Sequence, residues 1–293
     1  MNIKNYPEFT PLAADMKELF DEAFLKSQPF ISEFTFTNLY CWKDIYKFSV
    51  SIYEGLIILR SDASEVTKFF PPIGIGQQKT AVEKIIKDTK NPFIRLPETI
   101  AKLFEGGSSC KVTLDRDNSD YLYKTEELRL LKGKKYDAKR NFIKKFKSLN
   151  EYEYVRLNSF NAEDCFDFEE RWCLIKDCDN VEGLNNERQA IRKMIERFGD
   201  FNLIGAAIKV KGAICAVAIA EKLNQNTLVM HVLKADFNLQ GLYQVMLNEF
   251  LVNDSGSFEY VNLEQDLGVD GLRKAKLSYH PFKIIGKYTV SCI

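Results

Sequence analysis

The stretch LIGAAIKVKGAICAVAIAEKLNQNTLVMHVLKADFNLQGLYQVMLNEFLV, residues 203–252, carries the clearest secondary-structure pattern in the chain. Two apolar, β-rich runs on either side of Lys211-Gly212 predict a hairpin, and residues 227–233 predict a third strand. Residues 240–252 predict a helix, because large apolar side chains repeat there at helical spacing. This stretch therefore predicts three meandering strands followed by a helix.

The same order of elements is predicted in both halves of the chain. In the second half, amphipathic helices precede the three strands, and a strand, a helix and a terminal extended segment follow. In the first half, two helices lead to two strands and an extended segment, and a helix is predicted over residues 78–87. This is the element order of the GNAT acyltransferase superfamily, predicted twice, although no repeat is visible residue by residue. An ordinary α+β pair with a similar order is the alternative interpretation.

We therefore expect an α/β (α+β) protein with two tandem GNAT-like acyl-CoA N-acyltransferase domains, each a mixed sheet flanked by helices. The N-terminal domain is expected over residues 1–130 and the C-terminal domain over residues 131–293. The length of 293 residues suits two domains of roughly 100–200 residues each, and 45% hydrophobic residues supply their cores.

The composition excludes several classes of protein. Lys+Arg and Asp+Glu both number 41, so the net charge is zero, which excludes a globally basic nucleic-acid coat and a globally acidic solvating chain. No apolar run approaches the ~20 residues of a membrane-spanning helix. The N-terminal MNIKNYPEF lacks the apolar core of a secretory signal. We therefore expect a cytoplasmic protein.

Cysteine and histidine predict neither a metal site nor a disulfide framework. The seven cysteines are odd in number and show no C-x-x-C spacing, so we expect reduced thiols. Cys173 and Cys178 have no histidine nearby in the sequence. Of the two histidines, His231 is interpreted as a core residue and His280 as a turn residue. No metal ligands are therefore assigned.

The segment KGKKYDAKRNFIKKFK, residues 132–147, is the strongest local charge anomaly. Eight basic residues stand against one acid, Asp137, while Phe142, Ile143 and Phe146 form an apolar stripe at helical spacing. A helix with such a basic outer face is suited to an anion: the phosphates of CoA, a tRNA or lipid headgroups. The alternative is a solvated linker helix that balances the acidic residues 162–200.

Two glycine-containing segments are candidates for phosphate binding. Gly74-Ile75-Gly76 lies between a predicted strand and helix, where backbone amides can cradle a pyrophosphate, although a plain turn explains it as well. In the second half, Gly241 occupies the glycine position of the GNAT motif, and Tyr243 stands where that motif has a small residue. We expect the Tyr243 ring to obstruct a pyrophosphate, which argues against ordinary acetyl-CoA binding there.

The segment NLEQDLGVDGLRKAKLSYHP, residues 262–281, combines acids and bases at the end of a predicted strand and in the helix after it. Carboxylates at a strand end can accept a proton from an attacking amine or hydroxyl. The alternative is a helix with acids in its first turn and bases in its last, which suits the helix macrodipole. The acids are Glu264, Asp266 and Asp270, and the bases are Arg273, Lys274 and Lys276.

Five segments resemble one bacterial family: FTFTNLYCW (34–42), FPPIG (70–74), DYLYKTEEL (120–128), GKKYDAKRNFIKKF (133–146) and NLEQDLGVDGLRKAKLSYHPFKIIGKY (262–288). This uncharacterised family is related to the C-terminal domain of phosphatidylglycerol lysyltransferase. The resemblance covers nearly the whole chain and implies two GNAT-like domains. Relatives of this kind move an amino acid from aminoacyl-tRNA to a lipid or peptide acceptor.

The resemblance implies roles for the residues that match its motifs. Glu264 or Asp266 is expected to act as base or to orient the acceptor amine. Arg273, Lys276 and the Lys139–Arg140 pair are expected to hold a donor phosphate or to stabilise a developing oxyanion. The expected catalytic set is Glu264, Asp266, Arg273, Lys276 and Tyr279, and the expected donor-binding set is Lys135, Lys139, Arg140, Asn141, Gly241 and Tyr243.

The leading hypothesis is a transferase that moves an aminoacyl or acyl group to an amine or hydroxyl, such as a lipid headgroup or a peptide. Aminoacyl-tRNA or acyl-CoA would be the donor substrate, with no tightly bound cofactor. One alternative is an acyl-CoA-dependent N-acyltransferase that uses residues 74–76. Another is a non-catalytic module that binds RNA or anionic lipid through residues 132–147. The expected partners are thus tRNA or CoA, and anionic lipid contacted at its surface without a transmembrane segment.

Overall fold

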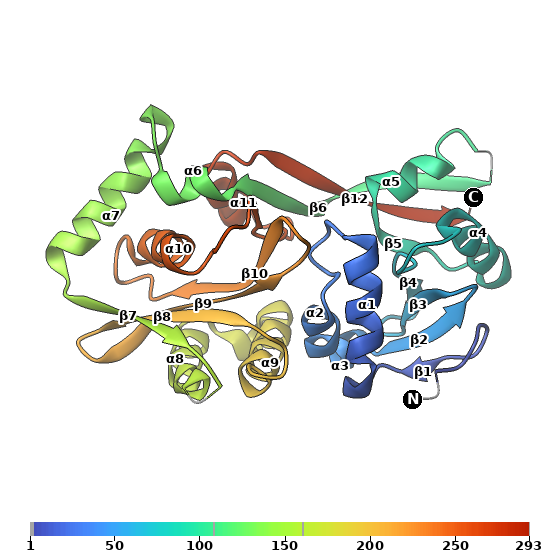
Figure 1. Cartoon of the computed structure of the whole chain (residues 1–293), viewed down its shortest axis with the longest axis horizontal. Coiled ribbons are helices and arrows are strands. Elements are labelled where there is room, and N and C mark those ends of the chain that lie inside the picture. The colour runs from blue at the N-terminus through green and yellow to red at the C-terminus, as the bar shows by residue number, and fades with distance from the viewer. Residues whose placement is uncertain (1–2, 108, 160, 293) are drawn as a thin grey trace. The chain divides into compact units, whose positions relative to one another are not determined.

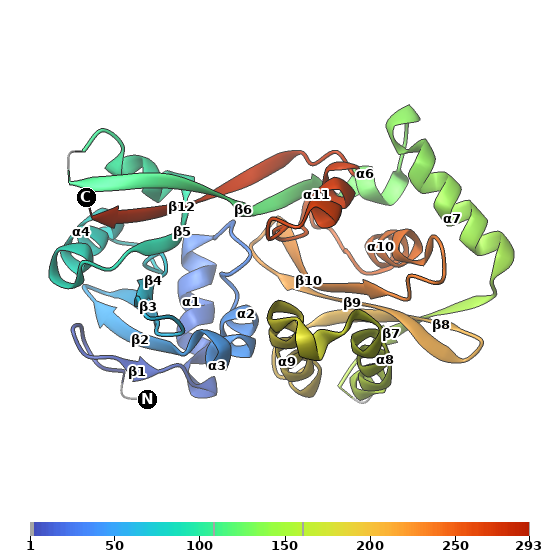
Figure 2. The same ribbon diagram turned by 180° about the vertical axis from the view of Figure 1, so that it is seen from behind.

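The computed structural model describes residues 3–107, 109–159 and 161–292. The chain forms two compact units, drawn from two sides in Figure 1 and Figure 2. Unit 1 comprises Met1–Tyr121, Glu264–Lys276 and Lys283–Ile293, and unit 2 comprises Leu122–Leu263 and Leu277–Phe282. Unit 1 therefore combines the N-terminal residues with two segments from the end of the chain.

Unit 1 contains a mixed sheet with the strand order β1-β2-β3-β4-β5-β12-β6. Strands β4 and β5 pair in parallel, while β1–β2, β2–β3, β3–β4 and β5–β12 pair antiparallel. The strands are β1 (Thr10–Pro11), β2 (Phe48–Tyr53), β3 (Leu56–Ser61), β4 (Lys68–Phe69), β5 (Phe93–Pro97), β12 (Lys283–Cys292) and the first part of β6 (Cys110–Lys124). Because β12 pairs with β5, the last strand of the chain belongs to the sheet of the first unit.

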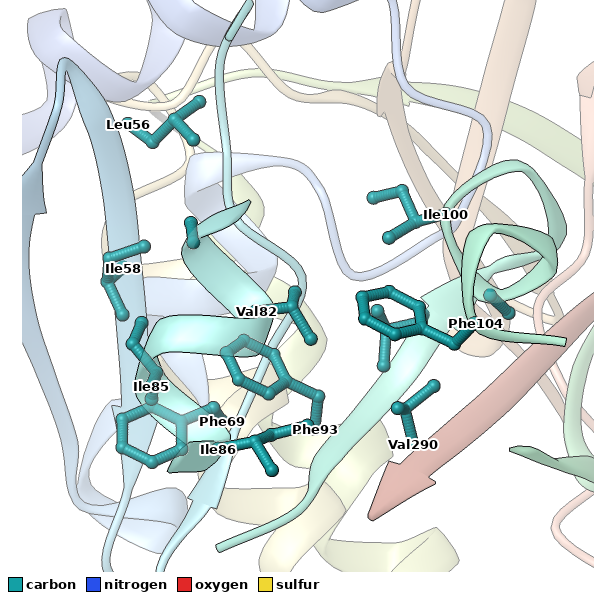
Figure 3. Close-up of a cluster of buried hydrophobic side chains, with 13 residues drawn as sticks. Leu56, Ile58, Phe69, Val82, Ile85, Ile86, Phe93, Ile100, Phe104 and Val290 are labelled. Atoms are coloured by element: carbon teal, nitrogen blue, oxygen red, sulfur yellow. The ribbon is translucent and has the colours of Figure 1, made fainter. Parts of the chain in front are cut away.

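Helix α4 of unit 1 buries apolar side chains against this sheet. Helix α4 contributes four buried residues to a cluster with β3, β4, β5 and β12, and Figure 3 shows Val82, Ile85 and Ile86 of this helix beside Phe69 and Phe93. The helices and 3-10 turns are η1 (Ala14–Met16), α1 (Lys17–Ser27), α2 (Phe36–Cys41), α3 (Lys43–Tyr46), α4 (Gln78–Thr89), α5 (Glu98–Ala101), η2 (Lys102–Phe104) and α11 (Asp270–Leu277), whose last residue falls in unit 2.

The strands of unit 2 follow the order β6-β11-β10-β9-β8-β7. The end of β6 is the first of them, β10 and β11 pair in parallel, and the other neighbours pair antiparallel. The strands after β6 are β7 (Tyr152–Leu157), β8 (Ile204–Val210), β9 (Ala213–Lys222), β10 (Thr227–Ala235) and β11 (Tyr260–Asn262). The predicted hairpin, third strand and following helix are confirmed in this unit.

Helices cover both faces of the unit 2 sheet. Helix α10 lies on one face of β8–β10, while α8 and α9 lie on the other (Figures 1 and 2). The helices and 3-10 turns are α6 (Thr125–Leu130), η3 (Lys134–Tyr136), α7 (Asp137–Leu149), η4 (Ala162–Cys165), α8 (Phe166–Lys176), η5 (Cys178–Asn180), α9 (Glu182–Glu196) and α10 (Leu242–Asn253). Three meandering strands, a helix and a parallel strand are the GNAT-like order that the sequence predicted.

Several expected details differ from the structure. The sequence predicts a strand over residues 45–53, but residues 43–46 form helix α3 and strand β2 starts at Phe48. Strand β7 and helix α6 were not predicted, because neither has a clear apolar period. The expectation of reduced thiols is wrong for Cys173 and Cys178, which form a disulfide between the end of α8 and η5. Within the described residues, no helix is long and apolar enough to cross a membrane.

Candidate functional site

The basic helix α7 directs one of its lysines toward the turn that follows α11. Lys139 Nζ donates a hydrogen bond to Ser278 Oγ at 2.6 Å and lies 3.8 Å from the centroid of the Tyr279 ring. Burial lowers the pKa of Lys139. No carboxylate pairs with this ammonium among the described residues, so its charge is available to an anion.

Tyr279 presents a buried hydroxyl beside this ammonium. The residue is 5% exposed, and its hydroxyl has no hydrogen-bond partner within the described part of the chain. Burial is the main cause that raises the pKa of Tyr279, and the neighbouring Tyr243 raises it further. Tyr243 lies in the first turn of α10 and is 37% exposed. We call Lys139, Tyr243, Ser278 and Tyr279 the Tyr279 cluster; all four belong to unit 2.

The other basic residues of this region have partners of their own. Lys135 Nζ donates to Glu127 Oε2 at 2.7 Å, and Tyr136 donates its hydroxyl to the same oxygen at 3.1 Å. Arg140 binds the Gly133 carbonyl at 2.9 Å and also pairs with Asp137. These contacts brace the loop before α7. Asn141 is exposed on the same helix.

Gly241 allows two helices to approach closely. It is the N-cap of α10 with φ +92°, and a Cβ on it would lie 2.5 Å from the Phe142 carbonyl oxygen of α7. The space in front of this glycine is thus filled by α7 backbone, which does not favour a pyrophosphate at this point. Gly76 similarly faces the Leu56 side chain, at 3.2 Å from a built Cβ, as expected for a packed turn.

In unit 1, Asp266 is fully buried and surrounded by donors. Its carboxylate accepts from Arg273 Nε at 3.0 Å, Arg273 Nη2 at 2.8 Å, Arg116 Nη1 at 3.1 Å, the Tyr121 hydroxyl at 2.5 Å and the Gly268 amide at 2.9 Å. Although burial opposes ionisation, these bonds together hold the pKa of Asp266 far below its usual range. Such a carboxylate is a poor proton acceptor, so this geometry does not favour the predicted role as base.

Three further residues of the predicted catalytic set, Glu264, Arg273 and Lys276, belong to unit 1 together with Asp266. Arg273 also binds Asp117 Oδ1 at 2.6 Å, which leaves its guanidinium committed to two carboxylates. Lys276 donates to the Gln265 carbonyl oxygen at 2.5 Å, and burial lowers its pKa to about 8. Glu264 adopts φ +57° and accepts the Tyr121 amide through its backbone carbonyl at 3.1 Å. The structure thus brings these four residues together in unit 1 and places Tyr279 in unit 2.

Two buried lysines of strands were not anticipated from the sequence. Lys287 of β12 is fully buried and pairs with Asp120 Oδ1 and Glu33 Oε2, both at 2.6 Å. Lys234 of β10 is 5% exposed and pairs with two glutamates of α8 and α9. A lysine flanked by strand residues, as in VLKA (232–235) or IGKY (285–288), is the signal that could have identified them.

Strand β10 extends beyond the end of its parallel neighbour β11. It pairs with β11 only over Thr227–Val229, and continues to Ala235 after β11 has ended at Asn262. The pairing of β10 with β9 is irregular between Met230 and Val232, next to His231. His231 contacts Glu221 Oε1 at 2.7 Å and its side chain is 1% exposed, as expected for a core histidine.

The antiparallel meander, the parallel strand that parts from it and the intervening helix define a GNAT-like α/β fold. The chain belongs to the family described as "Phosphatidylglycerol lysyltransferase, C-terminal", whose model matches residues 25–291. This membership agrees with the resemblance that the motifs indicated.

Solved structures and a curated relative are similar to the chain. A conserved protein of unknown function from Bacteroides thetaiotaomicron is 31% identical with a TM-score of 0.90, and the match covers 97% of this chain and 99% of that one. L-PGS from Bacillus licheniformis has a TM-score of 0.66 at 11% identity, over 99% and 94% of the two chains, which shows a shared fold.

An uncharacterized protein of Mycoplasmoides gallisepticum is 25% identical over 182 residues. That match covers 61% of this chain and 58% of the relative. The chain therefore spans less than two thirds of this curated relative.

Proposed function

We propose that this chain transfers an aminoacyl group from aminoacyl-tRNA to a hydroxyl or amine acceptor, such as a lipid headgroup or a peptide. The observation that carries the proposal is the Tyr279 cluster. It combines a buried hydroxyl without a hydrogen-bond partner among the described residues with an ammonium that no described carboxylate neutralises. Membership of the lysyltransferase family supports the choice of reaction.

In this proposal the cluster stabilises the negative charge that develops as the ester bond is broken. The acceptor oxygen or nitrogen bonds to the ester carbonyl carbon, the bond from that carbon to the ribose oxygen breaks, and the acceptor proton ends on the ribose oxygen. The Tyr279 hydroxyl is protonated at neutral pH, as any ordinary tyrosine is, and burial raises its pKa further; it donates a hydrogen bond to the developing oxyanion. The Lys139 ammonium supplies positive charge at the same place.

Acyl-CoA is the less favoured donor. The Phe142 carbonyl of α7 fills the space beside the Gly241 backbone, where a pyrophosphate would bind. Tyr243 lies in the first turn of α10, directly after this glycine. A CoA pyrophosphate at this helix start would have to displace α7. An aminoacyl-tRNA donor does not need a pyrophosphate there.

A transfer assay tests the proposal. Wild-type protein is mixed with tRNA charged with radiolabelled amino acids and with vesicles that contain phosphatidylglycerol, and label is measured in the lipid extract. A soluble amine acceptor is tested in parallel. Removal of one oxyanion donor costs roughly 10²–10³ in rate, so Tyr279→Phe is expected to reduce transfer by about that factor.

Matched variants distinguish a loss of catalysis from a general loss of positive charge and from a loss of folding. Lys139→Met is expected to reduce transfer strongly, whereas Lys144→Met, which removes an exposed lysine of the same helix, is expected to change it little. Melting temperatures of all variants are compared with wild type. Salt-sensitive binding of tRNA or vesicles without product would contradict transfer and support the non-catalytic alternative.

A further inference from the structure

A pocket of about 430 Å³ lies in unit 2, between helix α6 and the loop that joins α10 to β11. Its volume is within the usual range of small-molecule sites. The Tyr279 cluster contributes none of the described residues that line it. We call it the Thr125 pocket, and its polar lining consists of Lys124, Thr125, Glu126, Arg129, Ser257 and Glu259.

Hydrogen bonds of the main chain hold the two walls of this pocket in place. The Thr125 amide, in one wall, donates to the Glu259 carbonyl oxygen of the other at 2.9 Å. The Asn248 side chain of α10 donates to the Arg129 carbonyl oxygen at 2.9 Å, which fixes the end of α6. The pocket is therefore formed by the fold itself, and a ligand does not have to order its walls.

Thr125 contributes a buried hydroxyl to the lining. The residue is 2% exposed, and its Oγ1 has no hydrogen-bond partner in the part of the chain that the structure describes. A buried polar group without a partner destabilises a folded protein. A ligand that forms a hydrogen bond with this hydroxyl removes that cost.

Four charged side chains also line the pocket, two basic and two acidic. They are Lys124, Arg129, Glu126 and Glu259. No ion pair joins any of them to another residue within the described ranges of the chain. A simple anion in the pocket would face two carboxylates, and a simple cation would face two bases. A ligand with one group of each sign can pair with both kinds of side chain.

We propose that the Thr125 pocket binds a small zwitterion, which carries a primary ammonium group and a carboxylate or a phosphate. The two basic residues hold its anionic group, the two acids hold its ammonium, and the Thr125 hydroxyl adds a hydrogen bond. Leu130 and Phe258 also line the pocket and offer contact to an apolar part of the ligand. The site is separate from the Tyr279 cluster, so its test does not depend on aminoacyl transfer.

The first experiment compares each of two zwitterions with analogues that keep only one of its charges. Leucine is compared with 4-methylpentanoate, which lacks the ammonium group, and with leucinamide, which lacks the carboxylate. O-Phosphoethanolamine is compared with inorganic phosphate and with ethanolamine. All six compounds are titrated calorimetrically into the wild-type protein. At least one zwitterion is expected to bind at least tenfold more tightly than both of its analogues.

The outcome also distinguishes the two sources of such a ligand. Tighter binding of leucine assigns the pocket to a free amino acid, and tighter binding of O-phosphoethanolamine assigns it to a phosphate headgroup. The proposal is overturned if neither zwitterion binds at millimolar concentration. It is also overturned if a single-charge analogue binds as tightly as the zwitterion from which it derives.

Two double variants test which side chains hold which charge. All four residues are exposed, so the fold is expected to tolerate their replacement. Lys124→Met/Arg129→Met is expected to bind the zwitterion no more tightly than its cationic analogue. Glu126→Gln/Glu259→Gln is expected to bind it no more tightly than its anionic analogue. A double variant that keeps the full wild-type preference would contradict the assignment of these charges.

A matched control and a neutral variant complete the test. Lys132→Met/Lys144→Met removes two exposed bases of unit 2 that do not line the pocket, and is expected to bind the zwitterion as the wild type does. Thr125→Val keeps the shape of the side chain without its hydroxyl. Its melting temperature is expected to match or exceed that of wild type, with weaker binding of the zwitterion. Unchanged affinity in Thr125→Val, or loss of affinity in the control, would contradict the proposal.

Discussion

Arg273 donates two parallel hydrogen bonds to Asp266, from Nε to Oδ2 at 3.0 Å and from Nη2 to Oδ1 at 2.8 Å. The carboxylate is fully buried, while the guanidinium is partly exposed and extends to Asp117 at the surface. Tyr121 and Arg116 of β6 and the Gly268 amide donate the other hydrogen bonds to this carboxylate. Asp266 therefore links Arg273 of α11 to β6 within unit 1.

Asp266→Asn is therefore expected to destabilise the protein by about 3–5 kcal/mol, since it leaves buried cationic donors without their acid. Asp117→Asn removes the other, exposed partner of Arg273 and is expected to cost less than about 1 kcal/mol. Urea unfolding followed by circular dichroism measures both. Similar losses of unfolding free energy in the two variants would show that the buried Asp266 carboxylate contributes no more to stability than the exposed Asp117 carboxylate.

The same carboxylate makes stability depend on pH at the acid end. The folded-state pKa of Asp266 lies below the ordinary value of ~3.9, so its contribution is complete above that pH and is lost as the pH falls toward the folded-state pKa. The stability difference between wild type and Asp266→Asn should thus shrink from pH 7 to pH 3. A difference that stays constant over this range would refute the low pKa.

Lys276 should react as an amine at a lower pH than an ordinary lysine. Its pKa is lowered to about 8, mainly by burial, whereas a lysine in a model peptide titrates near ~10.4. We expect acetic anhydride to modify Lys276 with a half-maximal rate near pH 8, as quantified by mass spectrometry of tryptic peptides. A lysine peptide in the same reaction is the control, and a coincident pH profile for the two would contradict the prediction.

Gly241→Ala should destabilise unit 2 through a direct clash. The new Cβ would lie 2.5 Å from the Phe142 carbonyl oxygen, and the residue would also have to keep φ +92°. Gly212→Ala is a matched control, because its φ is +80° and nothing lies within 4 Å of its Cβ. We expect the control to cost about 1 kcal/mol from backbone strain and Gly241→Ala to cost clearly more, by urea unfolding. Equal losses of unfolding free energy in the two variants would mean that α7 shifts without cost to accommodate the new Cβ.

Local patterns were sufficient to predict much of unit 2. The hairpin, the third strand and helix α10 follow from apolar periodicity within about fifty consecutive residues, and each forms contacts with its sequence neighbours. Strand β7 and helix α6 have weak apolar periods, and β7 pairs with β8, which lies far away in the sequence. Their existence therefore depends on contacts that periodicity does not report.

The predicted site residues belong to two different units, which motif spacing could not reveal. Asp266, Arg273 and Lys276 lie in unit 1, whereas Tyr279, only three residues after Lys276, lies in unit 2 beside Lys139 of α7. Motif matching groups residues by their distance along the chain. Whether a carboxylate is saturated by donors, or a hydroxyl is left without one, depends on residues more than a hundred positions away.

The sequence by itself determined the meander and helix of residues 203–252, the family and the basic character of residues 132–147, because these depend on side-chain periodicity and on the composition of short segments. Only the tertiary structure decided which charges are neutralised. Lys234 and Lys287 look like isolated cations in two strands, but each is enclosed by two acids from other elements. Lys139 is one of eight bases in its segment, and burial against the Tyr279 ring sets it apart. Burial and pairing arise only when distant segments meet, and they decide which of many similar residues is available to a substrate.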